Sequence, residues 1–348
     1  SIETQYKAQL PFVVYRKPRE SQVKAQLQQT DDLSFVKDFT ETGFVFAPFD
    51  DSEDSVIFPL DKAKVIAVNY DVPQVESKIL SSGSLSSEAQ EFHVNLVNKG
   101  IKAINTGAFK KVVLSRQESV KLNGSNPISI FKNLLNNYNL AFVYCWYHPK
   151  VGLWLGATPE TLMKIDGNSF SIMALAGTKE YQGTLDVDWG EKEQLEQKIV
   201  TDFIVENLNP LVDSFNISEI ETVKAGNLLH LKTMISARLK TSSTIKQLIY
   251  ALHPTPAVCG TPKKEAMLYI NKFEPIDRAF YSGFLGEINI LKNNSTVTNL
   301  VVNLRCMHIN DLKATLFAGG GITSKSDPEK EWEETEAKLR TISSVFTT

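Results

Sequence analysis

The sequence predicts an α+β fold, in which strands and helices come in runs rather than in strict alternation. No glycine-rich fingerprint follows the first predicted strand, so a Rossmann nucleotide site has no support. The chain has 348 residues, of which 42% are hydrophobic and 22% charged, as in globular proteins with a substantial core. At about 150 residues per domain this length fits two domains, and a single large α/β body fits it as well.

The first 75 residues are expected to form short strands joined by polar connections. Apolar, β-rich stretches predict strands at 11–15, 43–49, 56–59 and 64–69. The acidic stretch 50–54 resembles a calcium loop in composition, but it lacks the glycine and the distal glutamate of an EF-hand. A solvated loop is therefore expected there.

Helices and strands follow in mixed order from residue 87 onward. Phe92, Leu96, Ile101 and Ile104 are spaced for one apolar face of a helix that begins near Ser87. Further helices are expected at 126–137, 189–208, 243–250, 262–271 and 328–346. Further strands, some apolar enough to be buried on both faces, are expected at 111–115, 141–147, 153–156, 169–174, 281–290, 297–304 and 312–317.

Charge, cysteine content and hydropathy exclude several classes of protein. Lys and Arg number 37 against 40 Asp and Glu, a net charge of −3, whereas a nucleic-acid binder needs clustered positive charge. The three cysteines, Cys145, Cys259 and Cys306, fit neither a disulfide framework nor a zinc site and indicate a reducing compartment. The longest apolar run, 140–147, is far shorter than the roughly 20 residues that span a bilayer, and no signal segment opens the chain. We therefore expect a cytoplasmic enzyme with no membrane or nucleic-acid partner.

Two acidic pairs stand in predicted helices far apart in the sequence. Glu193 and Glu196 are three residues apart and share a helix face, as do Glu331 and Glu334. Asp327 is a natural N-cap for the second helix. A solvated face explains such pairs, because helix N-termini favour acidic residues. Alternatively, both pairs converge on one hard cation such as Mg²⁺, which carboxylates hold together with an anionic substrate.

A glycine run and isolated polar residues at strand ends are the other candidate features. The segment 318–323 (AGGGIT) lies between a predicted strand and the capped helix, as either a tight turn or an anion cradle. Lys111 begins KVVLSR, Glu160 follows the turn GATPE, and Arg305 closes VVNLR. Each fits an ordinary strand-edge charge, but in a partly dry pocket a lysine acts as a base and a glutamate as an acid. His253, in HPTPA, is expected to position or pack, since no histidine has metal-ligand spacing to another.

Seven motifs occur in the order found in the chorismate-utilising enzymes: KVVLSR, LGATPETL, ALAGT, HPTPAVCGTP, FYSGFLGE, NLRCM and AGGGITSKSDPEKEWEET. The chain resembles this family, which includes isochorismate synthase, salicylate synthase and the first components of anthranilate and aminodeoxychorismate synthases. The resemblance is strongest to isochorismate synthase. It covers residues 105–348, whereas the strand-rich N-terminal region, residues 1–85, matches poorly. It implies one domain over 1–348, built from two packed, mostly antiparallel β-sheets with outer helices.

The resemblance also implies a substrate, chorismate, and a cofactor, Mg²⁺. By similarity, Glu196 and Glu334 ligate Mg²⁺, while Glu193 and Glu331 hold its waters. Arg305 and the backbone at Gly319 match positions that take the enolpyruvyl carboxylate, and Lys338 matches the metal end of the site. The full set of implied substrate-binding positions is Gly177, Thr178, His253, Tyr281, Arg305, Gly319 and Lys338.

Lys111 and Glu160 are the catalytic residues that the resemblance implies. Members of the family that add water carry a lysine at the position of Lys111, whose neutral amine takes a proton from the water that attacks ring carbon C2. Glu160 protonates the departing C4 hydroxyl. Ala176 stands where aminodeoxychorismate synthases often carry the lysine of PIKGT, which disfavours a covalent ring–lysine adduct. The expected activity is therefore that of an isochorismate synthase, an isomerase.

Two alternatives remain beside this expectation. A salicylate synthase shares the same residues and then eliminates pyruvate, and a non-catalytic chorismate-binding protein shares the fold. Because water rather than ammonia is the expected nucleophile, no glutamine amidotransferase partner is expected. We expect a monomer whose isochorismate serves either a menaquinone or a siderophore pathway.

Overall fold

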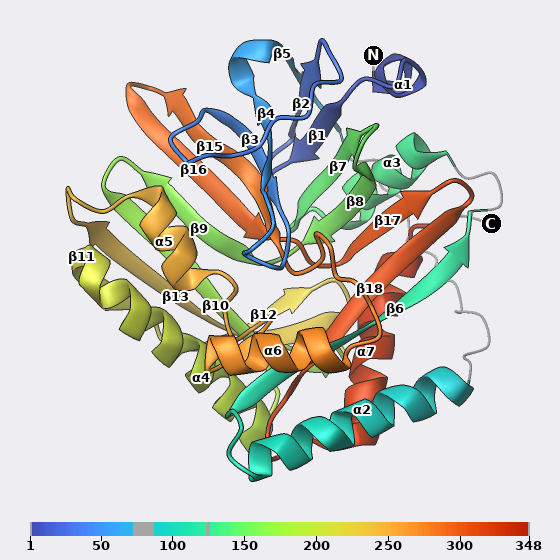
Figure 1. The fold of residues 1–348 in the computed structure, drawn as a ribbon, viewed down its shortest axis with the longest axis vertical. Coiled ribbons are helices and arrows are strands. Elements are labelled where there is room, and N and C mark those ends of the chain that lie inside the picture. Colours follow the sequence, from blue (N-terminus) through green and yellow to red (C-terminus); the bar gives the residue numbers. More distant parts are fainter. Residues whose placement is uncertain (1, 72–86, 123–125, 347–348) are drawn as a thin grey trace.

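The computed structural model describes residues 2–71, 87–122 and 126–346. Within these residues the chain forms two nine-stranded sheets and seven α-helices (Figure 1). Each strand pairing is antiparallel. The predicted α+β class, with two packed antiparallel sheets and outer helices, is therefore confirmed.

The strands of the first sheet come from both ends of the sequence. Their order is β14 (Gly260–Thr261), β6 (Lys111–Lys121), β18 (Lys313–Ile322), β17 (Cys306–Asn310), β8 (Gly152–Thr158), β7 (Phe142–His148), β1 (Phe12–Arg16), β2 (Gln22–Gln28) and β5 (Ala63–Asn69). The second sheet has the order β11 (Val212–Ile217), β13 (Leu228–Leu239), β10 (Ser169–Glu180), β9 (Thr161–Asp166), β16 (Ser295–Val302), β15 (Phe284–Lys292), β3 (Gly43–Ala47) and β4 (Val56–Pro59), with β12 (Glu221–Ala225) paired to β13. The strand-rich N-terminal region thus adds edge strands to both sheets.

The helices cover the outer faces and the ends of the sheets. They are α1 (Ile2–Lys7), α2 (Ser87–Asn105), α3 (Pro127–Asn137), α4 (Glu191–Leu208), α5 (Ile245–Leu252), α6 (Lys263–Phe273) and α7 (Pro328–Ser343), with the 3₁₀ turns η1 (Leu60–Lys62) and η2 (Asn209–Leu211). Helices α3 and α7 pack on the first sheet and α4 and α5 on the second. The predicted N-cap of α7 is confirmed, because the Asp327 carboxylate accepts from the backbone N–H groups of Glu329 (3.0 Å) and Lys330 (3.2 Å).

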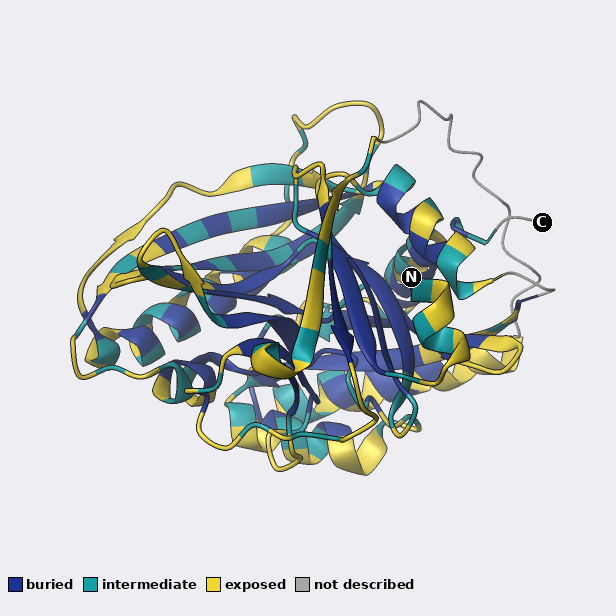
Figure 2. Cartoon of the chain, turned by 90° about the horizontal axis from the view of Figure 1, so that it is seen from above, coloured by how far each residue is buried: buried dark blue, intermediate teal, exposed yellow. Residues whose placement is uncertain are grey.

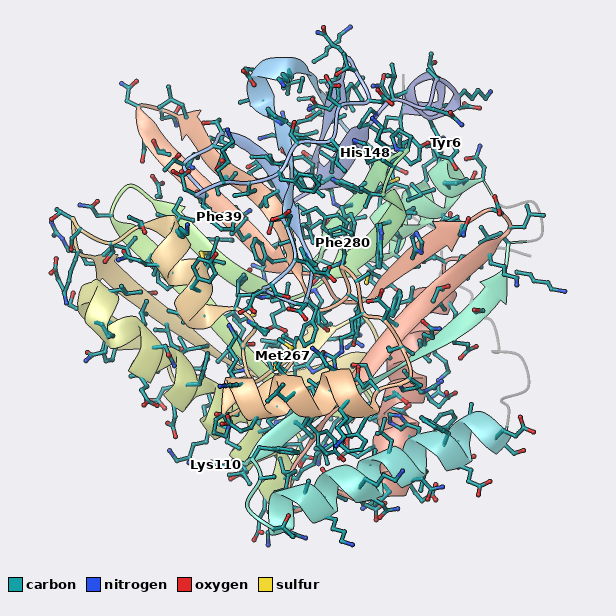
Figure 3. All side chains as sticks on the ribbon, viewed as in Figure 1. Tyr6, Phe39, Lys110, His148, Met267 and Phe280 are labelled. Carbon is teal, nitrogen blue, oxygen red and sulfur yellow. The ribbon has the colours of Figure 1, made fainter. Side chains whose placement is uncertain are left out.

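Aromatic side chains fill the space between the sheets. In β7, Phe142, Tyr144 and Trp146 face this inner core, while the residues between them face the helices. Phe280 lies near the centre of the molecule (Figure 3), where its ring stacks on Phe46 with centroids 4.2 Å apart. Figure 2 shows buried strands in the interior and helices whose outer faces are exposed. Burial on both faces explains why β7 is a continuous apolar run rather than an alternating one.

Several strands are not predicted by the sequence patterns: β2, β9, β11, β12, β13, β14 and β17. The short helix α1 is also unexpected. The sequence of β13, LLHLKTMISARL, is rich in residues that favour helices, so its composition does not indicate a strand. Its conformation follows from pairing with β10, β11 and β12, which are distant or unrecognised partners in the sequence.

The glycine run was expected to form a turn or a cradle between elements, and this placement is wrong. Gly319, Gly320 and Gly321 lie inside β18, opposite Ser115, Leu114 and Val113 of β6. The run therefore continues the sheet. Because these three glycines have no side chains, they leave space beside the strand for the charged residues described below.

Candidate active site

A cavity between the two sheets, next to α4 and α7, brings together most of the predicted site residues. Lys111 comes from β6, Glu160 from the turn between β8 and β9, and Arg305 from the connection between β16 and β17. The same cavity is lined by Gly177, Thr178, Glu196, His230, Tyr281, Gly319, Glu334 and Lys338. Residues that are far apart in the sequence thus meet around one space.

Lys111 is held in a dry position at the start of β6. Its side chain is 2% exposed, and its Nζ lies 3.6 Å from Oε1 of Glu196. Burial lowers the pKa of Lys111, since water no longer stabilises the ammonium form, and the Glu196 carboxylate only partly opposes this effect. The lysine is thus poised to lose its proton.

Glu160 also lines the cavity, and its pKa is shifted in the opposite direction. The residue is 3% exposed, and burial raises its pKa to about 8 although Lys111 and Arg305 act in the opposite direction. Glu160 is therefore protonated at neutral pH and has a proton to donate. The pKa of the buried lysine and the pKa of the buried glutamate on this cavity are thus shifted toward each other, one downward and one upward.

A hydrogen-bonded chain links Gly177, His230 and Arg305. Nδ1 of His230 lies 2.8 Å from the carbonyl oxygen of Gly177, and Nε2 lies 3.3 Å from Nη2 of Arg305. Burial lowers the pKa of His230 to about 3, so the ring is neutral. Since a carbonyl only accepts and a guanidinium only donates, the neutral ring carries its proton on Nδ1. This tautomer leaves Nε2 free to accept from Arg305 and to fix the guanidinium at the cavity.

The four predicted metal-binding carboxylates gather where α4 and α7 meet. Glu196 and Glu334 line the cavity, while Glu193, Glu331 and Glu334 line a larger, strongly charged pocket beside it, called here the outer pocket. Lys338 donates to Oε1 of Glu334 (2.6 Å) and to the carbonyl of Gly319 (2.7 Å). The two acidic pairs therefore converge rather than forming separate solvated faces.

The chemistry of this cluster fits a hard cation. Glu331 is 1% exposed, and its Oε2 has no hydrogen-bond partner within the described residues. Burial raises the pKa of Glu331 to about 7; Lys192 opposes this rise, and the carboxylates of Glu334 and Glu196 add to it. Burial would raise the pKa of Glu334 too, but the ammonium groups of Lys192 and Lys338 outweigh it and lower that pKa. Crowded, buried oxygen ligands of this kind suit Mg²⁺.

The carboxylates of this cluster do not form a complete metal coordination site in this arrangement. Across residues 2–71, 87–122 and 126–346, no group of three or more His, Cys, Asp or Glu side chains is placed to hold a metal ion. Instead the Lys192 ammonium bridges Glu331 and Glu334. The side chains of this cluster must shift before a metal binds.

The glycines of β18 make room for the charged side chains. A methyl group built on Gly321 would lie 1.9 Å from Oε1 of Glu196 and 2.8 Å from Cε of Lys111. One built on Gly320 would lie 3.0 Å from Oε2 of Glu331, and one on Gly319 would lie 2.6 Å from Oγ of Ser115. Because β18 carries no side chains at these positions, Lys111 and the carboxylates lie directly against its backbone.

We therefore expect Gly321→Ala to fold but to lose about 100-fold in turnover, the cost of a displacement of about 1 Å at reacting groups. The added methyl group displaces Glu196 and Lys111, while the strand backbone is compatible with alanine. The measurements are the melting temperature and turnover with chorismate, the substrate that the sequence resemblance implies, and Lys313→Ala at the exposed start of β18 is the control. Wild-type turnover in Gly321→Ala would show that catalysis does not require a glycine at this position.

His253 does not line the cavity, which contradicts its placement among the substrate-binding residues. Its buried ring packs edge-on against Phe284 with centroids 4.9 Å apart. Burial lowers its pKa to about 3, and its carbonyl accepts from Nζ of Lys263 (2.5 Å). The residue has a packing role at the end of α5.

Two charged or polar residues of the site are missing from the sequence-based set. His230 lies on β13, a strand that the sequence does not predict, so its direction could not be anticipated. Lys192 stands four residues before Glu196 on α4, a spacing that puts both on one helix face. The spacing of Lys192 and Glu196 could have identified Lys192 as a site residue. No comparable pattern in the sequence identifies His230.

Comparison with known proteins places the chain in a family. A family model described as "Chorismate binding enzyme" matches residues 51–347. Isochorismate synthase MenF of Pasteurella multocida is 31% identical over 265 residues, which cover 72% of this chain and 60% of that protein. Isochorismate synthase EntC of Escherichia coli is 32% identical over 247 residues, covering 68% and 62% respectively. The chain thus spans about 60% of the length of these relatives.

Solved structures share the fold. The DhbC protein of Bacillus anthracis matches with a TM-score of 0.79 and 22% identity, covering 99% of this chain and 98% of the other. MenF, the menaquinone-specific isochorismate synthase from Escherichia coli, matches with a TM-score of 0.76 and 19% identity, covering 97% and 89%. No helix in the described residues is both long and apolar enough to cross a membrane. With a family model covering most of its length, and isochorismate synthases related to it at about 30% identity, the chain belongs to the chorismate-binding enzyme family.

Proposed function

We propose that the protein is an Mg²⁺-dependent isochorismate synthase, which moves the hydroxyl group of chorismate from C4 to C2. The observation that carries the proposal is the pair of buried groups on one cavity. Burial lowers the pKa of Lys111, which favours a role as base, and raises that of Glu160 to about 8, which leaves it a proton to donate. Relatives named isochorismate synthase support the substrate and the reaction.

The reaction needs one base and one acid. The Lys111 amine takes a proton from water while the water oxygen forms a bond to ring carbon C2. The ring double bonds shift, the C4–oxygen bond breaks, and Glu160 gives its proton to the departing hydroxyl, which leaves as water. One water is consumed and one released, and proton transfer from Lys111 back to Glu160 restores both groups.

The remaining cavity residues hold the two carboxylates of the substrate. The Arg305 guanidinium, fixed by His230, suits the enolpyruvyl carboxylate, which it can bind through two parallel hydrogen bonds. Tyr281 and the backbone at Gly319 lie on the same cavity wall. The ring carboxylate faces the end lined by Gly177, Thr178 and Lys338.

Glu196 and Glu334 would hold Mg²⁺, with Glu193 and Glu331 around it. When bound, the ion supplies positive charge that neutralises the ring carboxylate and keeps it in the site. The ion would thereby offset the repulsion between the glutamate carboxylates of the cluster and a dianionic substrate.

The decisive experiment is to incubate the protein with chorismate and Mg²⁺ and to separate the products by chromatography. Isochorismate is the expected product. Salicylate with equimolar pyruvate, detected with a coupled dehydrogenase, would establish a salicylate synthase instead. Chorismate binding in a calorimeter without any product would establish a non-catalytic binding protein.

The isochorismate is proposed to serve a menaquinone or siderophore pathway. The monomeric state and the cytoplasmic location stay predictions.

Glu334→Gln should weaken Mg²⁺ binding at least about 100-fold, since loss of even an outer-shell partner of a metal costs about 10–100-fold. The substitution keeps the size of the side chain but removes the charge. Calorimetric titration with Mg²⁺ is the measurement, and Glu329→Gln at the exposed start of α7 is the control. An unchanged Mg²⁺ dissociation constant would remove Glu334 from the ligand set.

A further inference from the structure

One buried lysine has no role in the reaction described above. Lys192, on the first turn of α4, places its Nζ 2.8 Å from Oε1 of Glu331 and 3.4 Å from Oε2 of Glu334. The side chains of the three residues are 15%, 1% and 12% exposed, respectively. An ammonium group therefore lies between two carboxylates that α7 directs toward the metal end of the site.

The neighbouring lysines are engaged elsewhere. Lys338 binds Oε1 of Glu334 and the carbonyl of Gly319, and Lys111 lies next to Glu196. Within the described residues, Lys192 is the one basic side chain within 4 Å of the Glu331 carboxylate. The second oxygen of that carboxylate is buried without a partner. Lys192 is thus the internal counter-charge of the deepest glutamate in the cluster.

We propose that Lys192 is a positioning residue that occupies the place of the metal and must leave it when Mg²⁺ binds. This inference rests on the proposed function. Mg²⁺ binds oxygens at about 2.0–2.1 Å and demands a nearly octahedral set, so it needs the Glu334 oxygen that Lys192 holds and the space for a bound water beside Glu331. A divalent ion and an ammonium group on the same oxygens would also repel each other.

The structure offers the displaced side chain a place to go. The outer pocket adjoins the cluster and is lined by Lys192 itself. Eight acidic side chains line it, among them Glu191, Glu193 and Glu333, against four basic ones besides Lys192, so the acidic charge is in excess. The four-carbon stem of a lysine turns easily, and its compact ammonium group suits a wet acidic surface. Lys192 thus keeps the carboxylates together before the metal arrives and moves into the outer pocket afterwards.

Calorimetric titration of the full chain with Mg²⁺ alone, in the absence of chorismate, tests the exchange. Because the lysine and the ion compete, Lys192→Met is expected to bind Mg²⁺ about 10-fold more tightly than the wild type, within the usual range of linkage effects. Lys192→Arg, which keeps the charge, is expected to bind no more tightly than the wild type. Lys198→Gln, an exposed lysine on the same helix, is the control and should bind as the wild type does.

A second measurement uses the wild-type chain and does not depend on a variant that folds. Brief acetylation followed by mass spectrometry reports how accessible each lysine is. Saturating Mg²⁺ is expected to increase the labelling of Lys192 several-fold and to leave that of Lys198 unchanged. The control lysine is 70% exposed, so its reactivity does not depend on the cluster.

The outcomes separate this inference from the proposed function. Equal Mg²⁺ affinity in wild type and Lys192→Met, or labelling of Lys192 that does not rise with Mg²⁺, overturns the exchange while the metal requirement stands. Failure of every form of the protein to bind Mg²⁺ overturns the metal requirement of the proposed function, and the exchange with it.

Discussion

Lys111→Ala should lower the rate of isochorismate formation by about 10²–10⁴-fold, the usual contribution of a general base, while chorismate still binds. In the proposed mechanism the lysine acts on the attacking water rather than on the substrate carboxylates, so its loss removes proton transfer and leaves binding largely intact. Lys111→Arg should be equally inactive, because a guanidinium keeps its proton at any accessible pH. Turnover by product chromatography and the chorismate dissociation constant by calorimetry are the two measurements.

The neighbouring residue provides the control for this prediction. Lys110 is exposed at the lower edge of the molecule in Figure 3, outside the cavity, and Lys110→Ala should retain wild-type turnover. Activity in Lys111→Arg would show that positive charge, not a neutral amine, is what the site requires. Full activity in Lys111→Ala would remove the lysine from the mechanism.

Glu160→Gln should also reduce turnover by about 10²–10⁴-fold, since an amide of the same shape has no proton to give to the departing hydroxyl. The pH dependence of the wild type follows from the same residue. Burial raises the pKa of Glu160 to about 8, so the acid is protonated below that pH and loses its proton above it. Turnover is therefore expected to fall as the pH rises through about 8.

Initial rates between pH 6 and pH 10 measure this alkaline limb, and substrate binding at each pH shows whether the loss lies in catalysis. Asp166→Asn, at the exposed far end of β9, is the matched carboxylate control. A wild-type rate that stays constant to pH 10 would contradict the assignment of Glu160 as the acid. So would Glu160→Gln with wild-type turnover.

Much of the site could be predicted because polar residues interrupt apolar runs at particular points. Lys111, Glu160 and Arg305 each stand where a strand begins or ends, and the structure brings all three to one cavity. The cap at Asp327 fixes the start of α7, and helix spacing then puts Glu331 and Glu334 on one face. Local rules of this kind depend on neighbours within a few residues.

Features set by distant partners could not be predicted in the same way. Gly319, Gly320 and Gly321 suggest a turn by composition, but their pairing with β6 makes them part of a sheet. His230 needed β13, whose conformation depends on strands elsewhere in the chain. For His253 the sequence predicts a positioning or packing residue and also a substrate-binding one, and the packing of its ring on Phe284 agrees with the first. The organisation of residues 1–348 as one domain stays a prediction.

Under the proposed function, the late position of β18 in the sequence sets when the site can be completed during synthesis. Strand β6, which carries Lys111, is joined to the rest of the first sheet through β18, and α7 packs against β18 from outside. Lys111 is therefore synthesised long before the strand that pairs with β6 and the helix that carries Glu334. Activity in a translation reaction should lag behind the folding of the second sheet and report that the C-terminal strands and helix have packed.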